Sequence, residues 1–375
     1  LVSPVANLVA VPWVSLLVIP VAVLGALLLR VSEPAGGWLI DLASRVLDTI
    51  WPLLAWLGNS GMATWQQPQP PLWTVIPAMA GILLLFSPRG LPGRWAGLWL
   101  LLPMLAVRPS TPVAGEAVVT LLDVGQGLAA VVQTRHHTLV YDTGPRYSPT
   151  FDTGSSVLVP WLRSQGIRRI DRLLVSHGDN DHIGGLRSVM DSIPVDRLSA
   201  GVPSAVEGYP VEACRQGPGW NWDGVDFTIL HPPANSDLDG NNASCVLRIE
   251  SAGGHVALLT GDIEARVEKR LVAEHADSLH ADVLVVPHHG SLTSSTPGFI
   301  DATGTDIALY PVGYRNRYHF PRPEVVERYR SAGVRQYDTA SHGAVRVSLP
   351  ADNQAPQTTA WRCRLARYWR PGECL

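Results

Sequence analysis

Charged side chains are scarce in this chain of 375 residues, and their distribution is uneven. Asp, Glu, Lys and Arg make up 16% of the residues, and the segments 1–29 and 49–88 contain none of them. Such apolar blocks exclude an ordinary soluble start to the chain, and the Trp residues that border them are typical of membrane spans with interfacial belts. An initial Met is also missing, as we expect of a fragment of a longer protein.

A basic region ahead of the first apolar run is absent as well, which argues against a signal peptide. The run Val5–Leu29 is long enough to cross a bilayer, which needs about 20 residues. Two later apolar segments, Leu72–Phe86 and Trp95–Val107, are short for a span. Arg89 and Arg94 lie in the loop between them, and the positive-inside rule then favours an extracytoplasmic position for the following domain.

The segment Leu39–Leu57 differs from the other apolar segments. Its apolar residues recur with helical periodicity, but Asp41, Arg45 and Asp48 form a polar stripe between them. Such a helix lies in the membrane interface or lines a polar path. We therefore assign residues 1–108 to the C-terminal part of a transmembrane channel domain and residues 109–116, rich in Pro and small residues, to a linker.

Cys-x-x-Cys spacing is absent among the four cysteines, which argues against a structural zinc site. An oxidising compartment would permit a disulfide between Cys363 and Cys374. That disulfide would close the basic tail, residues 351–375.

Residues 117–350 show short apolar strands separated by Gly and Asp, with helical segments between them. Two groups of strands, each followed by helices, predict an α/β fold in which two sheets pack face to face with helices outside. We expect 199–224, which is rich in Gly, Pro and Trp, to be a long loop over one rim.

One short turn in this domain carries four residues of metal-ligand type: His177, Asp179, Asp181 and His182. The turn follows the apolar strand 171–175 and precedes a helical segment, which is where open α/β folds place their chemistry. Imidazole nitrogens with carboxylates suit a hydrolytic metal centre. An Asp- and Gly-rich surface turn is the alternative, but it does not require two His within six positions.

The spacing His-x-Asp-x-Asp-His resembles the His-x-His-x-Asp-His signature of the metallo-β-lactamase superfamily, with Asp179 in place of the middle His. The stretch 258–262 resembles the strand that delivers a bridging Asp, and 285–291 resembles the strand that delivers the last His. Together with Asp123-Val-Gly-Gln-Gly127, Asn241-Asn-Ala-Ser244 and the apolar leader, these motifs resemble the ComEC-type DNA-internalisation proteins of bacterial competence.

The resemblance implies a four-layer αββα sandwich with two divalent metal ions, Zn²⁺ or Mn²⁺. One ion would be held by Asp181, His182, Asp262 and His288, and the other by His177, Asp179 and Asp262. Consecutive strand residues point to opposite faces, so we expect only one of His288 and His289 to be a ligand, and the resemblance favours His288. Catalysis would depend on Asp181, Asp262 and His177. Residues expected to border the metals or the substrate are Asp123, Gln126, Asn242, Ser244, His289, Ser291, Asn316 and His319.

The resemblance also implies DNA as the substrate, with one strand imported through a membrane channel and the other hydrolysed outside the cytoplasm. Expected partners are DNA, membrane lipid, the remainder of the channel domain and other DNA-uptake proteins, in a multi-pass protein of the bacterial plasma membrane. The net charge of −3 is unusual for a DNA enzyme. Local arginines are the candidates for DNA contact: Arg163, Arg168, Arg169, Arg172, Arg315 and Arg317.

Two other functions compete with a nuclease. A metal-binding module that only grips or gates DNA would bind the metal without turnover. A membrane-anchored small-molecule hydrolase, such as a lactonase, would have an apolar ligand pocket and no basic track.

Overall fold

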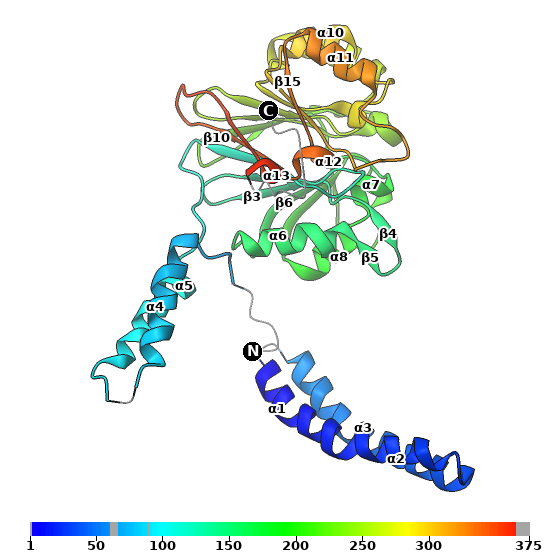
Figure 1. The fold of residues 1–375 in the computed structure, drawn as a ribbon. Coiled ribbons are helices and arrows are strands. Elements are labelled where there is room, and N and C mark those ends of the chain that lie inside the picture. Colours follow the sequence, from blue (N-terminus) through cyan, green and yellow to red (C-terminus); the bar gives the residue numbers. More distant parts are fainter. Residues whose placement is uncertain (1, 61–66, 89, 365–375) are drawn as a thin grey trace. The chain divides into compact units, whose positions relative to one another are not determined.

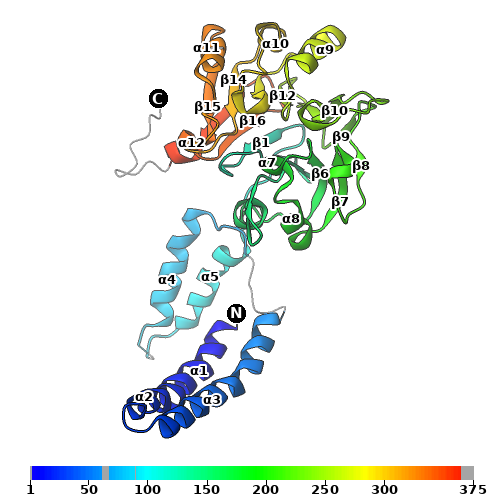
Figure 2. The ribbon, with the colours of Figure 1, turned by 90° about the vertical axis from the view of Figure 1, so that its right-hand side faces the viewer.

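The computed structural model describes residues 2–60, 67–88 and 90–364, and the chain forms two compact units, Leu1–Gln67 and Pro68–Leu375. This division differs from the boundary near residue 108 that the sequence predicts. The first unit contains α1 (Ser3–Trp13), a π-helical turn (Val14–Val18), α2 (Ile19–Leu28) and α3 (Glu33–Asn59). Figures 1 and 2 show α1 and α2 running alongside α3.

The first unit is held together by close backbone packing. A Cβ added at Gly36 would lie 2.5 Å from the backbone nitrogen of Leu29, so α2 and α3 can approach this closely only with Gly. The indole of Trp13 donates a hydrogen bond to the carbonyl of Val46 at 3.0 Å. Asp41 and Arg45 are exposed on α3, as the predicted polar stripe requires.

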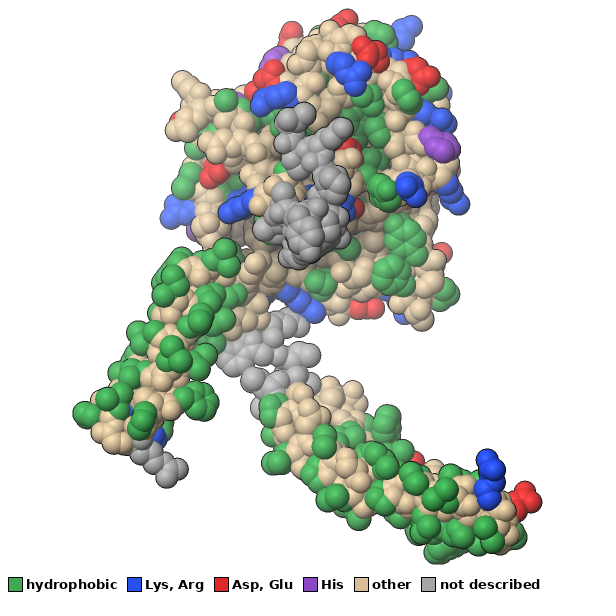
Figure 3. Space-filling view, viewed as in Figure 1, with side chains coloured by type: hydrophobic (Ala, Val, Ile, Leu, Met, Phe, Trp, Pro, Cys, Tyr) green, Lys and Arg blue, Asp and Glu red, His purple; other side chains and the backbone are tan. Residues whose placement is uncertain are grey.

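Within the described ranges, Ser3–Leu28 is the one helical stretch whose length and composition allow it to cross a membrane. The helices over Leu72–Leu85 and Arg94–Ala106 are apolar but shorter, as the sequence predicts. They include α4 (Val75–Leu85) and α5 (Gly97–Ala106), which pack through Gly81 and Gly97. Hydrophobic side chains cover the outer surfaces of all these helices (Figure 3).

The rest of the second unit contains two sheets packed face to face, as predicted. The first sheet has the order β17-β16-β1-β2-β3-β6-β7-β8. Its strands are β1 (Ala117–Leu121), β2 (Ala130–Gln133), β3 (Thr138–Tyr141), β6 (Ile170–Val175), β7 (Val195–Ala200), β8 (Glu212–Ala213), β16 (Val345–Leu349) and β17 (Gln357–Ala360). A small hairpin, β4 (Arg146–Ser148) and β5 (Phe151–Asp152), stands apart from it.

The second sheet has the order β15-β14-β13-β12-β11-β10-β9. Its strands are β9 (Trp220–Trp222), β10 (Val225–His231), β11 (Val246–Glu250), β12 (Val256–Leu259), β13 (Val283–Val285), β14 (Ile307–Tyr310) and β15 (Arg335–Asp338). The strands from β12 to β15 are parallel, so their carboxyl ends share one edge.

Helices cover the outer face of each sheet (Figure 1). The first sheet carries α6 (Val159–Ser164), α7 (Asn180–Ile183) and α8 (Leu186–Ser192). The second carries α9 (Ala265–His275), α10 (Pro297–Thr303) and α11 (Pro323–Ser331), and the short helices α12 (Thr339–His342) and α13 (Trp361–Arg364) come last. Three hydrophobic clusters fill the spaces between these layers, one between the sheets and one under each helical layer. This is the expected αββα sandwich.

One expectation about an irregular segment needs correction. The stretch 199–224 is not one long loop, because β8 and β9 lie within it and form edge strands of the two sheets. The described part of the basic tail contributes β17, which pairs antiparallel with β16, so the first sheet extends past residue 350. Cys374 lies outside the described residues, and the predicted Cys363–Cys374 disulfide therefore remains a prediction.

Candidate metal centre

Four side chains from three separate loops converge at one edge of the two sheets. Asp181 and His182 lie on α7 after β6, Asp262 follows β12, and His289 follows β13. One potential ligand atom from each of them lies within 4.8 Å of the others. The sequence brings them together because each follows a strand, and these strands end at the same edge of the sandwich.

The spacing within this group suits a metal ion. Nε2 of His182 lies 3.2 Å from Oδ1 of Asp262 and 3.3 Å from Nε2 of His289. Nε2 of His289 lies 3.3 Å from Oδ2 of Asp181. Ligands at about 2.1 Å from a tetrahedral ion are separated by roughly 3.4 Å, so one ion fits among these atoms. His182, His289 and Asp262 are buried, whereas Asp181 keeps 29% of its side chain exposed.

Each buried imidazole is oriented through its second nitrogen. Nδ1 of His182 lies 2.8 Å from Oδ2 of the buried Asp142, and Nδ1 of His289 lies 2.8 Å from the carbonyl of Pro311. Both Nε2 atoms therefore point into the group. A carboxylate or carbonyl behind a ligating His fixes its tautomer and its ring orientation.

A second possible metal position lies beside Oδ2 of Asp262. Nε2 of His177 is buried and has no hydrogen-bond partner among the described residues. It lies 3.5 Å from Oδ2 of Asp179 and 4.0 Å from Oδ2 of Asp262. Nδ1 of His177 contacts the hydroxyls of Ser176 (3.0 Å) and Ser244 (3.3 Å). An orphaned buried nitrogen next to two carboxylates fits a second cation.

The loop 176–185, which carries the four ligand-type residues and is called the metal loop below, packs tightly against the turn that carries Asp142. A Cβ at Gly184 would lie 2.2 Å from the backbone nitrogen of Arg146, and one at Gly185 would lie 2.4 Å from the carbonyl of Thr143. The Gly-Gly pair after the ligands is therefore required by close backbone approach. It holds His182 against Asp142.

The charges of the group are strongly coupled. Burial alone would raise the pKa of Asp181, but the hydrogen bond from His289 and the nearby imidazoles lower it to about 2. Burial would likewise lower the pKa of His289, but Asp262 and the hydrogen bonds to the two carboxylates raise it to about 9. Burial would also lower the pKa of His182, but Asp262 and Asp142 raise it well above its usual value. Both imidazoles therefore favour their protonated forms without a cation, and a bound cation would displace these protons.

The preference for His288 does not agree with the geometry, because His289 is the one that joins the group. Nε2 of His288 is 3.8 Å from Oδ2 of Asp262, and its Nδ1 contacts the hydroxyl of Thr293 at 3.0 Å. The strand β13 ends at Val285, and both His residues have positive φ angles in the following turn. Side-chain alternation along a strand therefore does not apply to them.

The other residues expected near the centre have separate partners. Asp123 forms an ion pair with Arg362, and Gln126 accepts a hydrogen bond from the backbone of Gly313 at 3.3 Å. Asn242 donates to Glu264 at 3.0 Å and braces the start of α9. The Ser244 hydroxyl accepts from the Asp262 backbone at 3.0 Å, so it supports the bridging position.

Three further predicted residues shape the loops that follow β13 and β14. The Ser291 hydroxyl lies 3.2 Å from that of Thr293. Asn316 forms hydrogen bonds with the backbone of Gly313 and Phe320 on its own loop. His319 is exposed, and none of the described contacts links it to the metal group.

The six candidate arginines are not equivalent. Arg168 and Arg169 precede β6, whereas the metal loop follows it, so a six-residue strand of about 20 Å separates them from the centre. Arg169 pairs with Asp196. Arg172 lies over the ring of Trp220 at 4.2 Å and is mostly buried. Arg163 donates to the carbonyl of Ser192 at 3.3 Å. Exposed arginines near the centre are Arg315 and Arg317.

Asp142 and the disulfide between Cys214 and Cys245 are the features that the sequence did not reveal. Asp142 was an ordinary turn residue as far as its local sequence showed, although it follows a strand that neighbours β6. The disulfide joins the stretch after β8 to the residue before β11, and it is buried next to Ser244. Spacing along the chain gives no signal for such a pairing.

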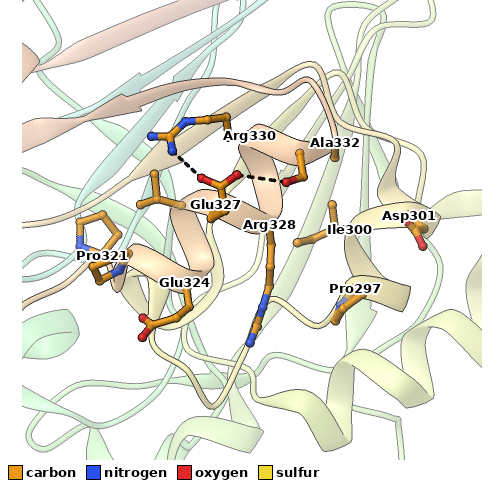
Figure 4. Close-up of a pocket in the computed structure, with 12 residues that line it drawn as sticks. Pro297, Ile300, Asp301, Pro321, Glu324, Glu327, Arg328, Arg330 and Ala332 are labelled. Atoms are coloured by element: carbon orange, nitrogen blue, oxygen red, sulfur yellow. Dashed lines mark hydrogen bonds and ion pairs between the residues drawn. The ribbon is translucent and has the colours of Figure 1, made fainter.

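A separate hollow of about 980 Å³ lies between α10 and α11 (Figure 4). It is lined by Pro297, Ile300, Pro321, Glu324 and neighbouring residues, and the Glu327–Arg330 ion pair lies beside it. None of the metal-group residues lines this hollow.

Comparison with known proteins agrees with the fold and the centre. Residues 122–313 match the family model "Metallo-beta-lactamase superfamily", and this match covers both the metal loop and the second sheet up to β14. The chain therefore belongs to this superfamily. Residues 1–92 match the model "Competence protein". Within the superfamily, this combination is that of the ComEC-type competence proteins.

Curated relatives share both parts. The chain is 37% identical over 351 residues to competence protein ComA of Neisseria gonorrhoeae, covering 93% of this chain and 48% of that protein. It is 28% identical over 379 residues to ComE operon protein 3 of Bacillus subtilis, covering 92% of this chain and 48% of that protein. The chain therefore spans about half the length of these relatives.

Among solved structures, the chain resembles Igni18, a metallo hydrolase from Ignicoccus hospitalis. The sequence identity is 16% and the TM-score 0.42, and the match covers 62% of this chain and 99% of that one.

Proposed function

We propose that residues 117–360 form a metal-dependent phosphodiesterase that hydrolyses DNA outside the cytoplasm, as part of a membrane protein for DNA uptake. The strand that is not imported would be its substrate. The observation that carries the proposal is the position of Asp262. Its Oδ1 lies 3.2 Å from Nε2 of His182, and its Oδ2 lies 3.5 Å from Nε2 of His289 and 4.0 Å from Nε2 of His177, which suits a carboxylate shared by two cations.

The residues fit such a pair of ions. Asp181, His182, Asp262 and His289 would hold one ion, and His177, Asp179 and Asp262 would hold the other. Divalent ions bound there would supply an activated water and would neutralise negative charge on phosphate oxygens. Asp179 makes the second position richer in oxygen than an all-imidazole site, which favours Mn²⁺ as well as Zn²⁺.

The protein's own contribution is to orient the metal-binding side chains and to exclude solvent from them. Asp142 and the carbonyl of Pro311 keep Nε2 of His182 and of His289 turned toward the centre. The burial of His177, His182 and Asp262 keeps bulk water away from these three ligands, whereas the side chains of Asp179 and Asp181 remain 59% and 29% exposed. A phosphodiester would approach from the side of these two carboxylates.

Two observations support DNA as the substrate and a location of the domain outside the cytoplasm. Arg315 and Arg317 are exposed on the loop that reaches the centre through Phe320, so positive charge lies close to the site despite the net charge of −3. The apolar stretch Ser3–Leu28 and the Cys214–Cys245 disulfide suit a membrane protein whose second unit lies in an oxidising compartment.

The test is cleavage of labelled single- and double-stranded DNA by the full chain in detergent or nanodiscs, with Mn²⁺ or Zn²⁺. We expect the Asp262→Asn protein to lose cleavage and to keep most of its DNA binding. Asp191→Asn, an exposed carboxylate on α8, is the matched control and should cleave as the parent does.

If Asp262→Asn cleaves as fast as the parent, the proposal is wrong. If the parent binds DNA but does not cleave it with any metal, the domain is a gripping module. If it hydrolyses lactones and leaves DNA intact, it is a small-molecule hydrolase.

A further inference from the structure

The loop between β14 and α11, residues 313–322, combines aromatic rings with positive charge. We call it the aromatic–arginine loop. It contains Tyr314, Tyr318 and Phe320 together with three arginines, and it has no acidic residue. Tyr314 is 73% exposed and Tyr318 is 41% exposed, so burial of these rings contributes little to the fold. Hydrophobic and basic side chains adjoin on the right-hand side of the domain in Figure 3.

The loop is held in one conformation by its own hydrogen bonds. The Asn316 side chain donates to the carbonyls of Gly313 (3.1 Å) and Phe320 (2.6 Å) and accepts from the Phe320 backbone (2.9 Å). Gly313 donates to Gln126 on the turn that follows β1. A ligand that binds the loop therefore meets rings whose positions are already fixed, which lowers the entropic cost of binding.

The rings lead from the surface to the metal group. Tyr318 and Phe320 are stacked with centroids 5.6 Å apart and an angle of 18° between their planes. Phe320 and His289 are stacked at 6.4 Å, also at 18°. These two steps place Tyr318 within about four nucleotides of the centre, at 3.4 Å per nucleotide of a stacked strand.

The arginines lie beside the exposed rings. Arg317 lies over the Tyr318 ring at 4.8 Å and donates to its hydroxyl at 2.6 Å, and Arg315 lies over Tyr314 at 5.2 Å. Neither arginine forms an ion pair with a carboxylate within the part of the chain that the structure describes. Their guanidinium groups remain available to an anion.

We propose that the aromatic–arginine loop binds an unpaired strand of DNA, with bases replacing the guanidinium groups on the ring faces of Tyr314 and Tyr318 and phosphates held by the displaced Arg315 and Arg317. This rests on the proposed phosphodiesterase function and names the form of its substrate. Stacking on exposed rings needs bases that are not paired within a duplex, and it tolerates any sequence. The loop contacts His289 through Phe320, so a strand bound there would be delivered to the metal group.

Binding of fluorescent dT20 to the full chain, measured by anisotropy in EDTA, tests the stacking. We expect the double variant Tyr314→Ala/Tyr318→Ala to bind dT20 about ten-fold or more weakly. Tyr314→Trp/Tyr318→Trp should restore the affinity, since it keeps the rings. An abasic strand of equal length should bind the parent and the Ala variant alike, because only the phosphates remain to be recognised.

The arginines have their own control. Arg315→Ala/Arg317→Ala should weaken the binding of both dT20 and the abasic strand and flatten their salt dependence. Arg187→Ala, an exposed arginine on α8, should change neither. A 20-base-pair duplex should compete weakly; if it binds more tightly than dT20, the loop is a duplex-binding surface and the proposal is wrong.

Failure of this proposal can be distinguished from failure of the nuclease proposal. Hydrolysis of bis(p-nitrophenyl) phosphate needs no stacked strand, so the Tyr variants should hydrolyse it as the parent does. If the parent hydrolyses that substrate while the Tyr variants bind and cut single strands normally, the loop has no such role. If the parent hydrolyses no phosphodiester but shows the expected binding pattern, the phosphodiesterase function fails and the loop remains a strand-binding surface.

Discussion

Asp142 is the residue whose replacement tests the metal centre most directly without touching a ligand. Its carboxylate accepts hydrogen bonds from the Ser176 backbone at 2.6 Å and from the Ser176 hydroxyl at 2.7 Å, and it lies 2.8 Å from Nδ1 of His182. Asp142 is fully buried, so no water replaces these contacts. The change Asp142→Asn keeps the volume and removes one acceptor.

The amide disturbs the tautomer of His182. With a cation bound, the carboxylate would keep the proton of His182 on Nδ1 and leave the lone pair of Nε2 for the cation. If the amide oxygen continues to accept from the Ser176 backbone, its NH₂ group faces Nδ1 and donates to it. The proton then moves to Nε2, which can no longer bind a cation. Loss of such an orienting partner costs about 10–100-fold in metal affinity, or roughly 1.4–2.7 kcal/mol.

The assay is a competition titration of the purified full chain against a chromophoric chelator with Zn²⁺ and with Mn²⁺. Asp171→Asn is the matched control, because Asp171 also accepts a backbone hydrogen bond, from Thr138 at 2.8 Å, but lies at the end of β6 that is far from the metal centre. We expect weakened metal binding for Asp142→Asn and parental binding for Asp171→Asn. Equal metal affinity in Asp142→Asn and the parent, with both folded, would refute the orienting role.

Three further outcomes follow from the same geometry. His289→Ala should remove about one bound ion per chain, whereas His288→Ala should leave metal content nearly unchanged; the reverse result by elemental analysis would restore His288 as the ligand. Because the pKa of His289 is raised to about 9 and that of His182 is also raised, metal binding at pH 7 should release protons, visible as a buffer-dependent enthalpy in calorimetry and reduced in His289→Gln. Removing the disulfide with Cys214→Ser/Cys245→Ser should lower the free energy of unfolding by about 2–4 kcal/mol, and an unchanged melting curve would contradict its presence.

The metal loop was predictable because the residues that identify it are close together in the sequence. His177, Asp179, Asp181 and His182 lie within six positions, and the preceding apolar run gives the strand that places them at a sheet edge. The two-sheet architecture was predictable for a similar reason, since the apolar strands and the helices between them alternate along the chain. The hydrophobic clusters confirm this by filling the space between the layers.

The choice between His288 and His289 was not predictable from strand periodicity. That rule holds only while the backbone is extended, and β13 ends before either residue. In the turn 287–290 both residues have positive φ angles, and the carbonyl of Pro311, just after the neighbouring strand β14, then fixes His289. The contact that decides the ligand thus comes from a residue 22 positions away.

The arginines proposed to contact DNA were likewise not predictable from closeness to the metal loop in the sequence. Arg168 and Arg169 precede the metal loop in sequence, yet they lie at the opposite end of β6 from it. Arg315 and Arg317 are more than a hundred residues from that loop in sequence, but stacking through Phe320 onto His289 brings their loop to the centre. Residues along one strand lie about 3.3 Å further apart with each position. Loops that end neighbouring strands, by contrast, can lie side by side although they are far apart in the sequence. A substrate track in this fold should therefore be sought in loops that end neighbouring strands, and the aromatic–arginine loop after β14 meets that condition while the arginines before β6 do not.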